Sequence, residues 1–141
     1  MFYGINFKEL PDGKVEVNCP DIPECTFVSD NRETASTELS HLIPGCLYAF
    51  YRKKGKPFPL PKATECDGFV RIPVKLQAKM LLWNFLKENH ISLREMSRRI
   101  GCSDMHSQRL VDITKDQASI DSVEQAFLKL GRTMNITLGK N

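Results

Sequence analysis

The residues from Leu93 to Ser103 read LREMSRRIGCS, and this stretch is the most specific pattern in the chain. Ser92 with Glu95 three positions later predicts a capped helix start, and Gly101 predicts the end of that helix. A helix-turn-helix needs a small residue midway along its first helix and, four residues later, a glycine that adopts positive φ. Ser97 and Gly101 meet both conditions, so this stretch predicts a helix-turn-helix.

The second helix of this motif is expected from Asp104 to Asp112. Met96, Ile100 and Leu110 would hold the two helices together through apolar contacts. One position departs from the usual pattern. The first buried residue of the second helix is commonly Ile or Val, whereas this chain has Ser107.

A helix-turn-helix of this kind places the N-terminal part of its second helix in the major groove of DNA. Arginine pairs well with guanine and glutamine with adenine. Asp104 would lie awkwardly near phosphate but can stabilise the helix start or accept from cytosine. The candidates for reading base edges are Ser103, His106, Gln108 and Arg109, and those for phosphate contacts are Arg94, Arg98, Arg99 and Lys115. The alternative is a helical bundle with a solvated basic face.

Two further helices flank this motif. Apolar residues at helical spacing predict one through Ala78 and Leu86, ending near Asn89. Ser119 can cap the other, whose apolar positions are spaced by three or four up to a stop at Gly131. The alternating Met134, Ile136 and Leu138 predict a terminal strand or tail.

The first 29 residues predict three short strands. Tyr3, Ile5 and Phe7 alternate with less apolar residues, the turn PDG at 11–13 follows, and Val15, Val17 and Cys19 resume the alternation. This pattern is typical of a β-hairpin. Two prolines predict an irregular segment over residues 20–25, and residues 26–28 predict a third strand.

A helix is expected from about Asn31 to Tyr51, with Asp30 as its N-cap and Glu33 in its first turn. Pro44 and Gly45 predict a kink or break inside it, but the apolar face continues on both sides, so we expect the helix to survive. The basic run at 52–56 favours a solvated helix end over a nucleic-acid patch. An extended connector and a strand over 68–73 complete the order βββαβ, which is an α+β sheet with its helix on one face.

Composition places the chain among ordinary globular proteins. Its 141 residues are 41% hydrophobic and 26% charged, unlike disordered or collagen-like chains. No apolar run approaches the ~20 residues of a membrane span, and the N-terminus lacks the pattern of a secretory signal. We therefore expect a soluble cytoplasmic protein.

The net charge of +3 divides unevenly. Residues 1–73 carry nine Lys or Arg against ten Asp or Glu, and residues 74–141 carry eleven against seven, giving −1 and +4. We therefore expect two domains with this boundary, and a phosphate-binding function in the second.

The sequence predicts neither a metal site nor a catalytic centre. Its five cysteines form no C-x-x-C pair and have no histidine at zinc-finger spacing, so free thiols are expected. A two-metal nuclease needs carboxylates at strand centres, but Glu9, Asp12, Glu16 and Asp67 lie at strand ends or in turns. We expect no cofactor.

Four elements of the chain, taken in their order, resemble a known protein family. The element PDIPEC at residues 20–25, the helix opened by Asp30, the sequence PFPLP at 57–61 and the Leu93–Ser103 motif together resemble the HicB antitoxins of bacterial HicA/HicB toxin–antitoxin systems. The resemblance covers nearly the whole chain. Departures from the family pattern are Pro44 with Gly45, Glu24 in place of a small residue, and Ser107.

The resemblance implies a partial RNase H-like N-terminal domain, residues 1–73, without nuclease activity. This domain would block a HicA-type toxin that cleaves mRNA. Asp21 and Glu24 in the loop at residues 20–25 are candidate toxin contacts; the alternative is that this loop has a purely structural role. Residues 74–141 would form the helix-turn-helix domain, which makes a homodimer or homotetramer and binds the operator of its own operon. The main alternative is a phage-type repressor whose N-terminal domain senses a ligand or another protein.

Overall fold

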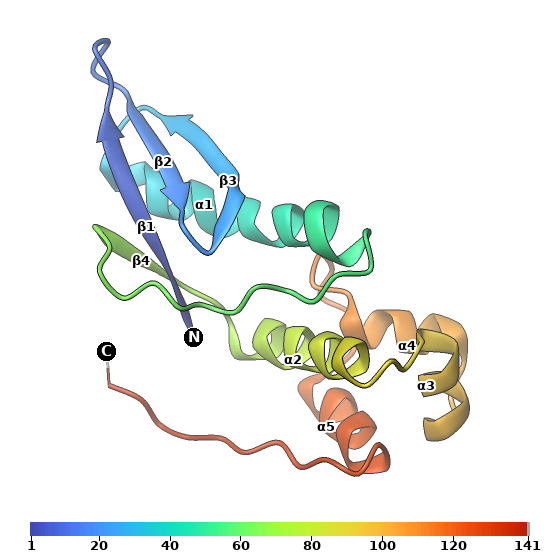
Figure 1. Cartoon of the computed structure of the whole chain (residues 1–141). Helices are drawn as coiled ribbons and strands as arrows, with labels where there is room; N and C mark the ends of the chain where they lie inside the picture. The colour runs from blue at the N-terminus through green and yellow to red at the C-terminus, as the bar shows by residue number, and fades with distance from the viewer. Residues whose placement is uncertain (141) are drawn as a thin grey trace. The chain divides into compact units, whose positions relative to one another are not determined.

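A computed structural model of the chain describes residues 1–140 and divides into two compact units, Met1–Gln77 and Ala78–Asn141 (Figure 1). The first unit contains four strands, an α-helix, a π-helical turn and the first four residues of the helix Val74–Glu88, and the second contains the rest of that helix and three more helices. The elements in chain order are β1 (Phe2–Glu9), β2 (Val15–Cys19), β3 (Ile22–Ser29), α1 (Arg32–Leu47), η1 (Tyr48–Arg52), β4 (Gly68–Arg71), α2 (Val74–Glu88), α3 (Leu93–Ile100), α4 (Asp104–Val111) and α5 (Ile120–Lys129). This is the predicted α+β class.

The strands form one antiparallel sheet in the order β3-β2-β1-β4. β1 pairs with β4 through Phe2–Ile5 and with β2 through Asn6–Glu9. Tyr3 and Ile5 of β1 and Val15, Val17 and Cys19 of β2 point into the core, because strand side chains alternate between the two faces of a sheet. α1 packs across one face (Figure 1), and the buried residues of this layer include Tyr3, Ile5, Val15, Val17, Ala35, Leu39, Ile43 and Leu47.

The third strand begins earlier than its prolines suggest. β3 starts at Ile22, which pairs with Cys19, whereas Thr26 pairs with the preceding residue, Asn18. The segment predicted as irregular therefore enters the strand, and the register shift absorbs three residues of β3. β3 is an edge strand, where a proline without an N–H group is tolerated.

One detail of α1, its N-cap, differs from the sequence prediction. Asn31, not Asp30, is the N-cap: its Oδ1 accepts a hydrogen bond from the Thr34 backbone N–H at 3.0 Å. As expected from its apolar face, the helix continues through Pro44, and the irregularity falls one turn later, where η1 adopts π-helical pairing. The apolar stripe continues past the proline to Leu47, and its burial maintains the helix.

The connector between η1 and β4 is tied to the sheet by its backbone. The Tyr3 hydroxyl donates to the Pro59 carbonyl, and the connector passes close to β1 at Gly4. A Cβ atom at Gly4 would lie 2.3 Å from Cys66 Sγ, so a larger residue there would have to displace the Cys66 side chain. Burial raises the pKa of Tyr3 above its usual range.

The second unit encloses an apolar core of its own. The Phe85 and Phe127 rings meet edge to face with centroids 6.1 Å apart, which joins α2 to α5. Gly131 adopts positive φ after α5, as predicted, and residues 133–140 form a tail rather than a strand. The buried residues include Met80, Leu82, Trp83, Leu86, Met96, Ile100, Leu110, Val111, Val123 and Phe127.

Among the described residues, no helix is both long enough and apolar enough to cross a membrane.

Candidate nucleic-acid interface

The turn between α3 and α4 is built from the residues that predicted it. Ser92 Oγ accepts from the Glu95 backbone N–H at 3.0 Å and begins α3. Gly101 ends α3 at φ 72°, and the backbone N–H groups of Gly101 and Cys102 both donate to the Ser97 carbonyl. Ser103 then caps α4 through the His106 N–H at 3.1 Å. The two helices are therefore joined by a short turn with a glycine-dependent conformation.

Two serines lie where these helices cross. Ser97 Oγ donates to Ser107 Oγ at 2.6 Å, and Ser107 is fully buried. Ser97 Oγ also lies 3.0 Å from the Leu93 carbonyl, and Cys102 Sγ lies 3.2 Å from Ser107 Oγ. A hydrogen-bonded hydroxyl pair thus occupies the place where Ile or Val is usual, and it satisfies the polar groups that close packing buries.

The exposed face of α4 carries a residue that the sequence analysis missed. Gln108 and Arg109 are exposed there as expected, and Met105 is 62% exposed between them in the helical projection. The Arg109 guanidinium lies 3.3 Å from Met105 Sδ. Met105 could have been identified from its spacing, because it lies three and four positions before Gln108 and Arg109 and so shares their helix face. An apolar side chain on that face can contact the methyl group of thymine.

The other two candidate base contacts are partly engaged within the protein. Ser103 Oγ serves as the α4 cap. His106 lies at the flank of α4 and lines a pocket of about 260 Å³ with Asp121, Gln125 and Lys129 of α5. The structure therefore brings Gln108 and Arg109 together on one exposed face and places His106 beside α5.

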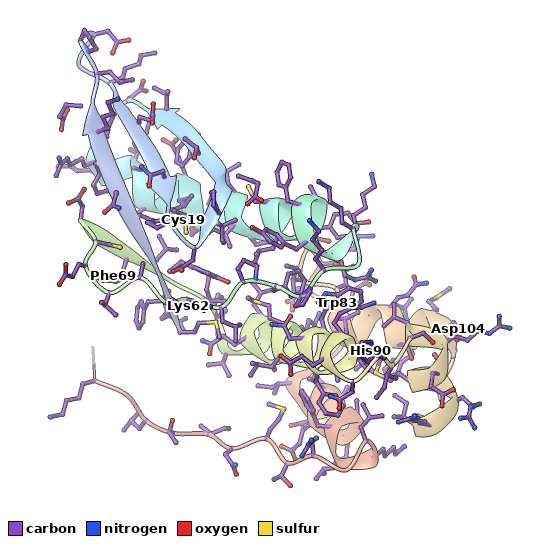
Figure 2. All side chains as sticks on the ribbon, in the orientation of Figure 1. Cys19, Lys62, Phe69, Trp83, His90 and Asp104 are labelled. Carbon is purple, nitrogen blue, oxygen red and sulfur yellow. The ribbon has the colours of Figure 1, made fainter. Side chains whose placement is uncertain are left out.

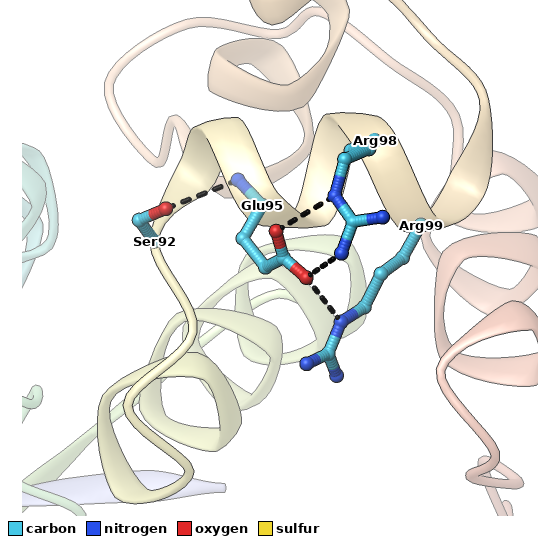
Figure 3. Close-up of polar contacts among 4 residues, drawn as sticks. All are labelled: Ser92, Glu95, Arg98 and Arg99. Atoms are coloured by element: carbon cyan, nitrogen blue, oxygen red, sulfur yellow. Dashed lines mark hydrogen bonds and ion pairs between the residues drawn. The ribbon is translucent and has the colours of Figure 1, made fainter.

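Glu95 accepts hydrogen bonds from two of the predicted phosphate contacts (Figure 3). Arg98 Nε lies 2.9 Å from Glu95 Oε2, and Arg99 Nε lies 2.9 Å from Glu95 Oε1. These bonds lower the pKa of Glu95 to about 2. The carboxylate offsets part of the positive charge that Arg98 and Arg99 would present to DNA.

The remaining phosphate candidates lie at opposite ends of the motif. Arg94 is exposed and lines a shallow groove with Arg98 and Asp104; Asp104 is labelled in Figure 2. Lys115 is exposed in the loop after α4. That loop is held by the buried Lys79, whose Nζ donates to the carbonyls of Asp112 at 2.8 Å, Lys115 at 3.3 Å and Gln117.

The two candidate toxin contacts also have partners within the first unit. Asp21 Oδ2 accepts from the backbone N–H groups of Lys62 and Ala63, so it positions the connector. Glu24 Oε2 accepts from the Tyr51 hydroxyl at 2.7 Å. Burial and this bond to Glu24 raise the pKa of Tyr51 to about 12. Asp21 lies in the turn between β2 and β3 and Glu24 lies in β3, so both carboxylates belong to the same hairpin.

The described residues contain no cluster of His, Cys, Asp or Glu suited to a metal ion. Asp67 Oδ2 accepts from the Phe7 N–H, and Glu9 pairs with Arg32 at 3.2 Å. The cysteines are free thiols, as expected. Burial raises the pKa of the Cys25 thiol, which disfavours a reactive thiolate there.

Comparison with known proteins decides the family. No family model matches the chain. The antitoxin HicB of Pseudomonas fluorescens (strain Pf0-1) is 31% identical over 138 residues, which cover 96% of this chain and 92% of that protein. The chain belongs to the HicB antitoxin family. The resemblance seen in the sequence is thereby confirmed.

Other HicB antitoxins match over a similar length. Antitoxin HicB 2 of Photorhabdus laumondii is 29% identical across 96% of this chain and 95% of its own length. The antitoxin HicB of Escherichia coli (strain K12) is 28% identical across 98% of this chain and 99% of its own length. The similarity to HicB proteins therefore spans both structural units.

Proposed function

We propose that this HicB chain is an antitoxin that binds and neutralises a HicA-type mRNA-cleaving toxin and represses its own operon by binding operator DNA. Near full-length similarity to proteins named antitoxin HicB supports the first role. The α3–turn–α4 geometry carries the second. We assign toxin binding to residues 1–73 and DNA binding to residues 74–141, a boundary four residues before the division between the two structural units.

The DNA-binding role rests on the helix-turn-helix interpretation of α3 and α4. A capped first helix, a glycine at positive φ and a tight serine crossing support that interpretation. α4 is the recognition helix in this proposal. Arg109 and Gln108 read base edges, Met105 contacts a thymine methyl, and Arg94 holds phosphate. Ser103, His106, Arg98, Arg99 and Lys115 complete the proposed set, with Arg98 and Arg99 attenuated by Glu95.

The test is operator binding by the purified chain, measured by fluorescence anisotropy on the promoter DNA upstream of its own gene. Arg109→Ala should weaken binding by about 1 to 3 kcal/mol and relax specificity at one base pair. Arg71→Ala, an exposed arginine of β4 outside the motif, is the matched control. Equal losses in both variants, or no loss in either, would exclude α4 as the recognition helix.

The toxin-binding role is proposed for the first unit, which we describe as partial RNase H-like. The strand order β3-β2-β1-β4 with a helix on one face supports that description. The unit acts by covering the toxin surface rather than by catalysis. The mildly acidic charge of residues 1–73 suits a basic, RNA-binding partner.

Asp21 and Glu24 are proposed contacts on this unit. Co-expression with the toxin encoded beside this chain should restore growth, and the double variant Asp21→Asn/Glu24→Gln should restore it less. The double variant Asp12→Asn/Glu16→Gln on the β1–β2 hairpin controls for the loss of two charges. A failure of the wild-type chain to relieve toxicity would count against the antitoxin role itself.

We also propose self-association through the second unit. Ile136 is 81% exposed and Leu138 fully exposed in the tail, and apolar side chains left in water favour burial against a partner. A paired set of recognition helices then fits a palindromic operator.

A further inference from the structure

The turn that follows α1 carries an unusual density of cations and exposed aromatic rings. We define the basic–aromatic turn as residues 48–56, YAFYRKKGK. Four of the nine cationic residues of the first 73 lie in the last five positions of this turn. The rest of that segment is strongly acidic in balance, so positive charge is concentrated at this one place.

Aromatic rings are exposed within the same turn. Tyr48 is 43% exposed and Phe50 is 38% exposed, whereas the apolar residues of the preceding helix face are buried. Lys54 Nζ lies 5.7 Å from the centroid of the Phe50 ring. Phe50 and Lys54 are thus presented together to solvent, whereas Tyr48, two residues before Phe50, lies on the other side of the helical turn. Leaving both rings uncovered costs free energy.

The backbone holds this arrangement in place. η1 continues α1 as a π-helical turn, and such turns occur often at functional sites. The turn closes through a hydrogen bond from the Lys56 N–H to the Tyr51 carbonyl at 2.9 Å, with Gly55 at φ 69°. Tyr51 is anchored to β3 through Glu24. The exposed groups therefore stand on a fixed support.

This combination matches single-stranded nucleic acid. Such ligands offer a phosphate backbone to cations and unstacked bases to aromatic rings, and every base has a face that can stack. Duplex DNA hides those faces, so the aromatic component favours the single strand over the duplex. An acidic protein surface is the alternative partner, because aromatic residues also pack at protein interfaces, and the toxin-binding measurement below tests it.

We propose that the basic–aromatic turn is a second nucleic-acid site of this protein, which binds single-stranded RNA or DNA with little sequence preference. Lys53 and Lys54 contact phosphates, and Tyr48 and Phe50 stack on bases. This site lies in the first unit and is independent of α4, so it does not depend on the proposed operator binding.

The test uses the full chain and fluorescein-labelled single strands of mixed sequence, about 12 nucleotides long, as RNA and as DNA. Tyr48→Ala/Phe50→Ala should weaken binding at least about 30-fold while leaving competition by inorganic polyphosphate, which has no bases, unchanged. Lys53→Gln/Lys54→Gln should reduce the slope of log affinity against log salt by about 1.4, or ~0.7 for each lost phosphate contact.

Matched variants complete the design. Lys8→Gln/Lys14→Gln removes two exposed cations from the β1–β2 hairpin of the same unit and should leave affinity unchanged. Arg109→Ala should also bind single strands as the wild type does, which separates this site from α4. Urea unfolding of each variant confirms that it is folded.

Three results would overturn the proposal. Wild-type affinity in the ring variant would leave only unspecific charge attraction. An equal loss in the hairpin control would mean that the position of the cations does not matter. Loss of toxin binding in Lys53→Gln/Lys54→Gln with unchanged oligonucleotide binding would assign the turn to an acidic protein surface. The RNA and DNA arms then decide which sugar is preferred.

Discussion

At the scale of single residues, the crossing of α3 and α4 shows how a departure from a pattern acquires a physical reason. The sequence identified Ser97 as the small residue at the crossing and Ser107 as an anomaly, but not that the two hydroxyls bond to each other at 2.6 Å. No spacing rule links a residue in one helix to a particular residue in the next. The contact depends on the crossing geometry, which only the folded unit supplies.

Replacing Ser107 by alanine should lower the free energy of unfolding of the second unit by about 1 kcal/mol, because Ser97 loses a buried hydrogen-bond partner. In a double-mutant cycle, Ser97→Ala/Ser107→Ala should cost less than the two single changes added together. The only tryptophan, Trp83, is buried in this unit, so its fluorescence in urea follows the transition. Thr133→Ala, in the exposed tail, is the control. Strict additivity would show that the hydroxyls act separately.

Glu95 gives α3 a dependence on pH with a definite sign. Its pKa falls from 4.5 to about 2 through Arg98 and Arg99. A carboxyl group with a depressed pKa in the folded state stabilises that state above its unfolded pKa, and the stabilisation is lost as pH falls through the folded value. The wild type should therefore exceed Glu95→Gln in urea midpoint at about pH 6, with the difference shrinking towards pH 2.

The same variant has a second expected effect. Glu95→Gln leaves Arg98 and Arg99 with their full charge, so operator binding should tighten while stability falls. Opposite changes in the two quantities distinguish a local charge effect from general damage to the fold. A difference in urea midpoint that stays constant from about pH 6 to pH 2 would contradict the assigned ionisation.

At the scale of elements, local patterns predicted most helices and strands, and nonlocal contacts decided the remainder. The hairpin, α2, α3, α4 and α5 follow from alternation, caps and glycine stops within each segment. β3 extends through Pro23 because pairing with β2 and an edge position tolerate it. α1 survives Pro44 because its apolar stripe is buried on both sides of the proline.

In the candidate sites too, some features follow from the local sequence and others depend on nonlocal contacts. Exposure of Gln108 and Arg109 follows from helical spacing, whereas engagement of Asp21 and Glu24 depends on a connector about 40 residues away for Asp21 and on Tyr51 for Glu24. No local pattern contains those bonds. The buried Lys79 is another example, since its ammonium bonds carbonyls more than 30 residues later in the chain.

Lys79→Met should destabilise the second unit by about 2 kcal/mol or more, because three carbonyls of the loop between α4 and α5 lose their donor. The loss should weaken operator binding as well, since that loop carries Lys115. Trp83 fluorescence in urea measures the stability change. Lys140→Met removes an exposed lysine from the same unit and should have an effect within about 0.5 kcal/mol. Equal effects would mean that the Lys79 bonds contribute nothing to folding.

At the scale of the whole molecule, charge is distributed unevenly both between the two halves of the chain and within each half. Residues 1–73 sum to −1 and residues 74–141 to +4, yet the acidic segment holds the basic–aromatic turn and the basic one holds the charge-neutralising Glu95. Net charge alone would assign nucleic acid only to the second unit. The local arrangement instead gives each unit a surface with its own chemistry.

The tail at residues 133–140 provides the last prediction, which concerns assembly. Ile136 and Leu138 lie in water in the single chain, and a β-type pairing of two tails would bury both because they occupy alternate positions. Ile136→Ser/Leu138→Ser should therefore reduce the molar mass measured by light scattering to that of one chain. Binding to a palindromic operator should weaken by at least about tenfold, since two linked recognition helices bind more tightly than one. Affinity for a single half-site should be unchanged.

Thr133→Ser/Asn135→Ser alters polar positions of the same tail and should leave the oligomer intact. An unchanged mass in the double variant would move the contact between chains to the folded helices of the second unit.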